Sequence, residues 1–167
     1  MLVGHVSAES KVTSFYTVTN KCSVVKDNKV GFINKDNELV IPYKFDYGYR
    51  KFDVDFVFEG GLSIMTDGRG ACGLIDKSGK WVIEPKYDEI YSGWRNKYRV
   101  VKDNGEYGLL VDSTFILPLE YDYIEYAENG VIVVKDGWMK HLDFEGNVLH
   151  DFITDYGFSV FRLRQKQ

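Results

Sequence analysis

Short runs of alternating or continuous apolar residues recur along the chain, and most of them end at glycine, asparagine, aspartate or proline. Runs of this kind are typical of β-strands. No window carries the i, i+3, i+4, i+7 apolar spacing of an amphipathic helix. The expected strands are 14–19, 22–26, 30–34, 38–41, 56–58, 62–65, 73–76, 81–84, 99–102, 107–111, 115–117, 123–126, 131–135, 138–143 and 148–149. The pattern therefore predicts an all-β chain.

These runs form a repeated phrase. Each copy has a glycine-containing strand, an acidic or amide corner, a second strand that reaches a proline, and an aromatic-aspartate pair. The clear copies span Val30–Asp46, Cys72–Asp88 and Tyr107–Asp122. A weaker copy is expected at Trp138–Leu149, where we place Met139 at the glycine position. Repetition of this kind indicates an array of similar supersecondary units.

Each copy is expected to be an antiparallel meander, because Asn-Gly and Asp-Gly pairs favour tight hairpins. We expect its proline to end the third strand or to lie on an edge, since proline cannot donate to a ladder. The glycine spacings of 42 and 35 residues lie near the ~40–45 residues of a propeller blade. We predict antiparallel β-meander repeats in a compact propeller-like array of about four units, with an open twisted β-repeat sheet as the alternative.

The whole chain, 1–167, is interpreted as one repeat domain. Segments 15–18 and 158–162 resemble strands of internal units, so the two ends are expected to complete one unit and to share a sheet, which would hide sheet edges. The predicted units are approximately 11–47, 56–91, 98–126 and 130–163.

Composition points to a globular intracellular protein. The chain has 44% hydrophobic residues, no basic and apolar leader, and no apolar stretch long enough to cross a membrane. A cytoplasmic location and no membrane partner are therefore expected. Cys22 and Cys72 lie in apolar strand runs, so we expect buried thiols and not a disulfide.

Charge is unevenly distributed. Between Asp103 and Asp155 there are twelve acidic residues and two basic ones, whereas the net charge of the chain is −4. An acidic surface attracts basic partners and disfavours direct binding of nucleic acid. A solvated surface that only improves solubility is the alternative.

The residues with catalytic or ligating potential are better explained as scaffold. Asp46, Asp88 and Asp122 recur once per copy and are expected to cap turns. The histidines, His5, His141 and His150, match no metal-binding spacing. The Gly-x-G-x-x-Gly string at 68–73 lies between strands and lacks the helix that binds a phosphate. We therefore expect no enzyme, cofactor or metal, and we keep a carboxylate-based glycoside hydrolase as a remote alternative.

The copies resemble the WG-repeat family, whose units read roughly Trp-Gly-aromatic-Ile-Asp, then Gly-Lys-x-Val-Ile, then Pro-x-Lys-Tyr-Asp. The copy at 72–88 shows the likeness best. The tryptophan position holds Val30, Cys72 and Tyr107 in the clear copies, and the tryptophan is interpreted as surviving at Trp138. The resemblance implies a β-rich binding module with no reaction attached. Small members resemble immunity proteins, which cover the active site of a bacterial toxin, often a nuclease.

We therefore predict an intracellular module that binds a basic protein toxin, most specifically a nuclease. A regulatory or envelope-associated protein- or peptide-binding scaffold is the alternative, and the oligomeric state is left open. The irregular segment 47–61 is either a plain loop or a recognition loop. The candidate contact residues are Asp112, Glu120, Asp122, Tyr123, Glu125, Tyr126, Glu128, Trp94 and Arg95.

Overall fold

The computed structural model describes residues 11–12, 21–47, 56–91 and 97–152, and these contain strands and turns but no helix. The all-β prediction is thus confirmed for the described residues. The strands are β1 (Lys11–Val12), β2 (Lys21–Lys26), β3 (Lys29–Asn34), β4 (Leu39–Asp46), β5 (Leu62–Thr66), β6 (Cys72–Asp76), β7 (Trp81–Tyr87), β8 (Glu89–Tyr91), β9 (Tyr98–Asp103), β10 (Glu106–Val111), β11 (Thr114–Tyr121), β12 (Tyr123–Ala127), β13 (Gly130–Lys135), β14 (Trp138–Leu142) and β15 (Val148–Phe152).

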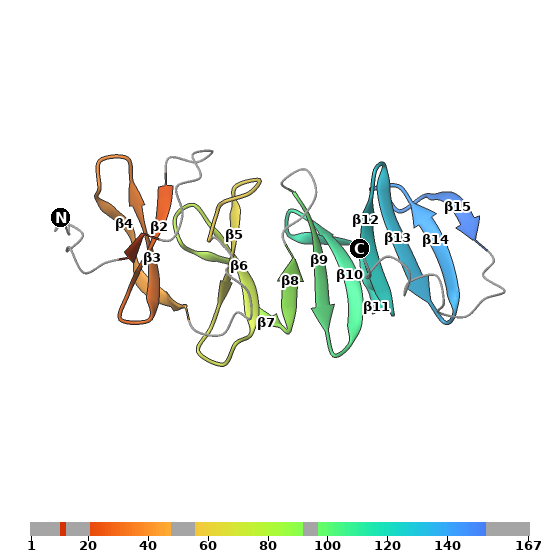
Figure 1. Cartoon of the computed structure of the whole chain (residues 1–167), viewed down its shortest axis with the longest axis horizontal. Coiled ribbons are helices and arrows are strands. Elements are labelled where there is room, and N and C mark those ends of the chain that lie inside the picture. The colour runs from red at the N-terminus through yellow and green to blue at the C-terminus, as the bar shows by residue number, and fades with distance from the viewer. Residues whose placement is uncertain (1–10, 13–20, 48–55, 92–96, 153–167) are drawn as a thin grey trace, which may run out of the picture. The chain divides into compact units, whose positions relative to one another are not determined.

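The chain divides into two compact units, 1–92 and 93–167, and each contains two meanders (Figure 1). We call β2–β4 meander 1, β5–β7 meander 2, β9–β11 meander 3 and β13–β15 meander 4. Consecutive strands within each meander pair antiparallel. One predicted strand is wrong: residues 56–58 form no strand, and the buried rings of Phe56 and Phe58 pack into the core of the first unit.

Meanders 1 to 3 share an irregular pairing of their second and third strands. In meander 2, Cys72 pairs with Tyr87 while Leu74 pairs with Ile83, so the third strand carries extra residues at this point. The strand that carries Pro85, β7, is an edge strand of its sheet, which is one of the two places expected for the proline. The other expectation is wrong, because the bulge holds Pro85 inside the strand and the strand does not end there. The reason is that a bulge frees a residue from donating to the ladder. The same pairing recurs around Pro42 and Pro118.

The bulge requires the repeated glycine. A Cβ built on Gly73 would lie 2.5 Å from the carbonyl oxygen of Ile83 and 2.8 Å from the nitrogen of Pro85. Both atoms belong to the backbone, so they cannot swing away as a side chain could. Gly31 and Gly108 meet the equivalent carbonyl oxygens, of Ile41 and Leu117, at 2.8 and 2.9 Å. The repeated glycine is therefore explained by close approach of two backbones.

Meander 4 departs from this geometry. Lys140 pairs with Asp151 and His141 with His150 in unbroken register, so the proline-type bulge is absent. Counting back from the Asp143 turn, as from the Asp76 turn, places Lys140 at the glycine position. This corrects the alignment that placed Met139 there. Trp138 pairs with Lys135 in the same way as Lys29 pairs with Lys26, so it does not occupy the family's tryptophan position.

The two meanders of each unit share one hydrophobic core. In the first unit, Val30, Phe32 and Ile41 of meander 1 form one core with Met65 and Ile75 of meander 2. In the second unit, residues of meander 3 pack in the same way against residues of β12 and meander 4. That core contains Tyr98, Val100, Leu109, Leu117, Tyr121, Ile124, Val131, Val133, Leu142 and Phe144.

One turn contact repeats in both units. A Cβ on Gly79 would meet Ile41 at 2.7 Å, and one on Gly146 would meet the equivalent Leu117 at 3.5 Å. Within each unit, the turn between the second and third strands of the second meander therefore rests on the third strand of the first meander.

The described sheets are open. Strands β1 and β7 form the two edges of one sheet, and β12 and β15 form the edges of another. This corresponds to the alternative of an open β-repeat sheet, and no described sheet closes into a ring. Segments 15–18 and 158–162, which were expected to share a sheet, lie outside the described residues. Of the two cysteines, neither forms a disulfide; Cys72 is buried as expected, whereas Cys22 is half-buried.

Candidate functional site

Three of the candidate contact residues serve the fold of the second unit. The Tyr126 hydroxyl accepts a hydrogen bond from the Val100 amide at 3.1 Å and donates one to the Tyr98 carbonyl at 3.0 Å. It therefore links β12 to the start of β9. The carboxylate of Asp122 accepts the Asp136 amide at 2.8 Å, which confirms the expected turn-capping role for this aspartate.

Glu120 is the third of these residues. Its carboxylate lies 3.1 Å from the ammonium of Lys135. The hydrogen bond to Glu120 raises the pKa of Lys135 above its usual range. Because Glu120 and Asp122 flank the same corner, both carboxylates lie beside the β13–β14 turn.

Asp112 and Glu128 lie at the other end of the second unit. The Asp112 amide bonds to the carbonyl of Lys97 at the start of β9, and Glu128 occupies the β12–β13 turn. The length of β12 separates Glu128 from Asp122 by six residues, which is about 20 Å of extended chain. The carboxylates of Asp112 and Glu128 are exposed, and no ion pair to either of them is found within the described residues.

A further carboxylate, Glu145, joins this end, although the sequence pattern did not single it out. It is exposed in the β14–β15 turn, next to Phe144, whose ring stacks on Tyr98 with centroids 4.1 Å apart. The β12–β13 turn lies against the end of β14, since a Cβ on Gly130 would meet the Leu142 carbonyl oxygen. We call Asp112, Glu128 and Glu145 the acidic end of the second unit. These turns are far apart in the sequence and become neighbours through strand pairing and packing.

Tyr123 and Glu125 lie between the two ends, on β12. Tyr123 is 37% exposed, and its ring meets that of Tyr107 edge to face at 5.6 Å. Burial, followed by the nearby charge of Glu125, raises the pKa of the Tyr123 hydroxyl. Glu125 is half-buried. The sequence-predicted contact set is thus spread along the second unit, and Trp94 and Arg95 lie outside the described residues.

Other aspartates stabilise the turns in which they lie. Asp76 Oδ1 accepts the amides of Ser78 and Lys80, and Asp143 Oδ1 accepts those of Glu145 and Asn147. Hydrogen bonds to the ionised form lower the pKa of both aspartates, the largest coming from the side chains of Ser78 and Asn147.

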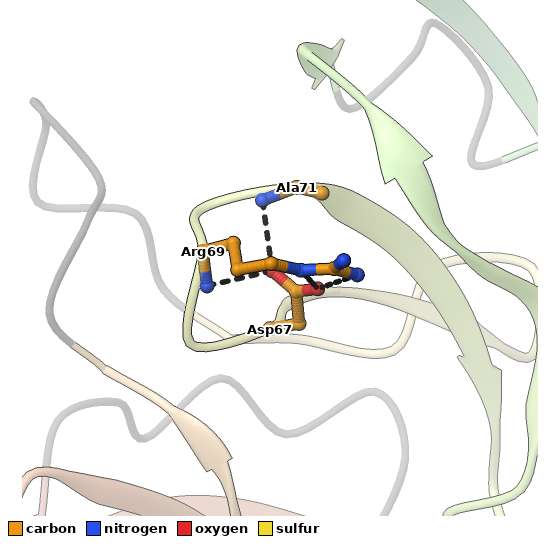
Figure 2. A network of polar contacts seen from close by, with 3 residues as sticks. All are labelled: Asp67, Arg69 and Ala71. Atoms are coloured by element: carbon orange, nitrogen blue, oxygen red, sulfur yellow. Dashed lines mark hydrogen bonds and ion pairs between the residues drawn. The ribbon is translucent and has the colours of Figure 1, made fainter.

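Asp67 repeats this arrangement in the turn between β5 and β6. Figure 2 shows its carboxylate accepting the amides of Arg69 and Ala71 and pairing with the Arg69 guanidinium at 2.8 Å. The side-chain hydrogen bond from Arg69 is the main cause of the lowered pKa of Asp67. The Gly-x-Gly-x-x-Gly string therefore begins in a hairpin turn, and no helix follows it among the described residues.

The described part of the chain contains no group of three or more histidine, cysteine, aspartate or glutamate side chains arranged to hold a metal ion. It also contains no helix of the length and apolarity needed to cross a membrane. One pair escaped the spacing rule used on the sequence: His141 and His150 are nine residues apart but directly opposite each other on β14 and β15.

The comparison with protein families matches a WG containing repeat at residues 31–64, 73–107 and 112–137. These segments cover more than half of the chain. The chain belongs to the WG-repeat family. Each matched WG segment starts in one meander and ends in the next: the first ends in β5, the second at the start of β10 and the third just after β13. The sequence period is therefore out of phase with the meander. The family suggests a β-repeat module that binds proteins. A search of curated proteins found no match.

Proposed function

We propose that this WG-repeat protein is a non-enzymatic, cytoplasmic inhibitor that binds a basic protein through the acidic end of its second unit. The residues that recur between meanders are accounted for by backbone packing and turn capping. Asp112, Glu128 and Glu145 vary between copies and occupy adjacent exposed turns. This separation of scaffold from exposed charge is the observation that carries the proposal.

The charge balance supports a basic partner. Residues 97–151 contain eleven acidic side chains and five basic ones. Three of those bases act inside the protein: Arg99 is buried, while Lys135 and Lys140 pair with Glu120 and Asp151. Each ion pair cancels one acid against one base, so it is the burial of Arg99 that leaves the exposed surface of this region more acidic than its composition indicates. Such a surface speeds the encounter with a basic protein and orients it.

The specific partner that we propose is a bacterial toxin, and within that class a nuclease. A nuclease active site must attract a phosphate backbone, so basic side chains are expected around it. A rigid acidic surface can cover such a site and compete with its substrate. Central charge pairs that lose water on binding carry coupling energies of about 1.5–7 kcal/mol, whereas pairs at the rim mainly accelerate association.

The test is to mix the protein with the product of the neighbouring gene and to measure complex formation and nuclease activity. We expect a stoichiometric complex, inhibition that substrate relieves, and affinity that falls as salt rises. Asp112→Asn with Glu128→Gln should weaken binding at least tenfold. Asp103→Asn with Glu106→Gln, at the opposite end of the same unit, removes the same charge and serves as the control.

Two results would count against the proposal. The absence of any complex at micromolar concentrations would remove the toxin partner. Equal weakening by both double variants would remove the acidic end as the contact, leaving only a general charge effect. Binding without inhibition would instead favour the regulatory scaffold.

A further inference from the structure

Two histidines lie side by side in the β12–β15 sheet of the second unit. His141 on β14 and His150 on β15 are directly paired in the antiparallel register. Their rings stack, with centroids 5.7 Å apart and planes inclined by 28°. Directly paired residues project from the same face of a sheet, so both imidazoles lie on the side from which one ligand would approach.

The pair replaces an apolar pair found at the same place in every other meander. The equivalent pairs are Phe32 with Ile41, Leu74 with Ile83, and Leu109 with Leu117. Phe32, Ile41, Leu74 and Leu109 are fully buried. Meander 4 therefore exchanges both partners of a core contact for imidazoles, while its flanking turn keeps the capping aspartate Asp143.

The hydrogen bonding of His141 is incomplete. Its Nε2 atom is shielded from solvent and has no hydrogen-bond partner within the described residues. An unsatisfied, shielded nitrogen is costly. The neighbouring carboxylate of Asp151 is not placed to satisfy it, because adjacent residues of a strand point to opposite faces and Asp151 pairs with Lys140 at 3.5 Å.

We propose that His141 and His150 bind one borderline divalent transition-metal ion, of the class of Zn²⁺, Ni²⁺ or Cu²⁺. Imidazole nitrogen suits these ions, whereas Mg²⁺ and Ca²⁺ prefer oxygen ligands. His150 is exposed, so it opens the pair to solvent, and water fills the other coordination positions. The ion would link β15, the edge strand, to β14. This site is independent of the acidic end.

The test is isothermal titration of the full chain with Ni²⁺ and with Zn²⁺, followed by histidine ring resonances in NMR. We expect one ion per chain, and the signals of two of the three histidines should shift together. His141→Leu and His150→Leu install the residue that meander 3 carries at both positions, so each variant should fold. Each variant should lose more than ~10-fold in affinity for the metal ion. That figure is the smallest loss typical when only a residue that supports a metal ligand is removed, and here a ligand itself is lost.

His5→Ala is the matched control, since it removes the remaining histidine and should leave binding unchanged. A second control is Mg²⁺, which should produce no saturable shift of the histidine signals. The proposal is overturned if no saturable binding is detected at millimolar Ni²⁺ and Zn²⁺. It is overturned as well if the leucine variants, shown to be folded by their amide spectra, bind as tightly as the parent.

Discussion

Meander 4 and the three meanders before it have the same strand order but differ in how the second strand pairs with the third. In meanders 1 to 3 a glycine faces a proline-containing bulge; in meander 4, Lys140 faces Asp151 in regular register. Glycine and bulge are thus lost together. The difference teaches that the glycine is required by the bulge on the neighbouring strand and not by its own strand.

The largest expected effect tests this coupling directly. Gly73→Val should destabilise the protein by about 3 kcal/mol, at the upper end of typical overpacking costs, because its Cβ would meet the backbone at 2.5 Å. Lys140→Val, at the equivalent position of meander 4, loses a surface ion pair with Asp151 and the contact of the ammonium with the Trp138 ring, and it should cost about 1 kcal/mol or less. Urea denaturation measures both. Equal losses would show that the bulge is not the reason for the glycine.

A medium effect is expected at the link between β12 and β9. Tyr126→Phe removes the hydroxyl that bonds both the Val100 amide and the Tyr98 carbonyl, and it should cost about 1–2 kcal/mol because buried backbone groups lose a partner. Tyr107→Phe is the control, a half-buried tyrosine for which no hydroxyl hydrogen bond is found among the described residues. Its expected change is about 0.5 kcal/mol or less. Similar losses in both variants would contradict the role of the link.

The smallest effect concerns the turns between the second and third strands. Asp76 and Asp143 cap these turns in meanders 2 and 4, whereas meander 3 has Val111 at the position and a shorter turn. Because the pKa of both aspartates is below the ordinary 3.8, their contribution is complete above that pH. It is lost as the pH falls through the lowered values.

Asp76→Asn with Asp143→Asn should therefore make stability less dependent on pH below 3.8, because the amide oxygen still accepts hydrogen bonds but does not titrate. Urea midpoints measured across this acid range provide the test. A variant that loses stability as steeply as the parent would show that other groups dominate the acid response.

Much of the fold could be predicted from the sequence, because alternation and turn residues are local signals. The strands around Gly31, Gly73 and Gly108 and the turn between Asn104 and Gly105 are of this kind. The position of Pro85 inside a strand could not be predicted, since a bulge depends on the partner strand. The same reason hid the His141–His150 pair, because one bulge shifts every later pairing by a residue.

The candidate site was less accessible to sequence reasoning. Charge counting found the acidic region, but it could not separate carboxylates that cap turns or pair internally, such as Asp122 and Glu120, from those that are exposed. It counted Glu145 but did not place it with Asp112 and Glu128, which Glu145 joins only through the packing of three turns. Burial and pairing decide these roles, and neither is encoded in the order of residues along one strand.

The phase difference between WG segment and meander has a consequence for how such chains can be edited. A cut from one repeated glycine to the next, such as 31 to 73, removes parts of two meanders and joins the remainders into one whole meander. Shortening or duplicating this protein in steps from one repeated glycine to the next should therefore rebuild a whole meander at the junction.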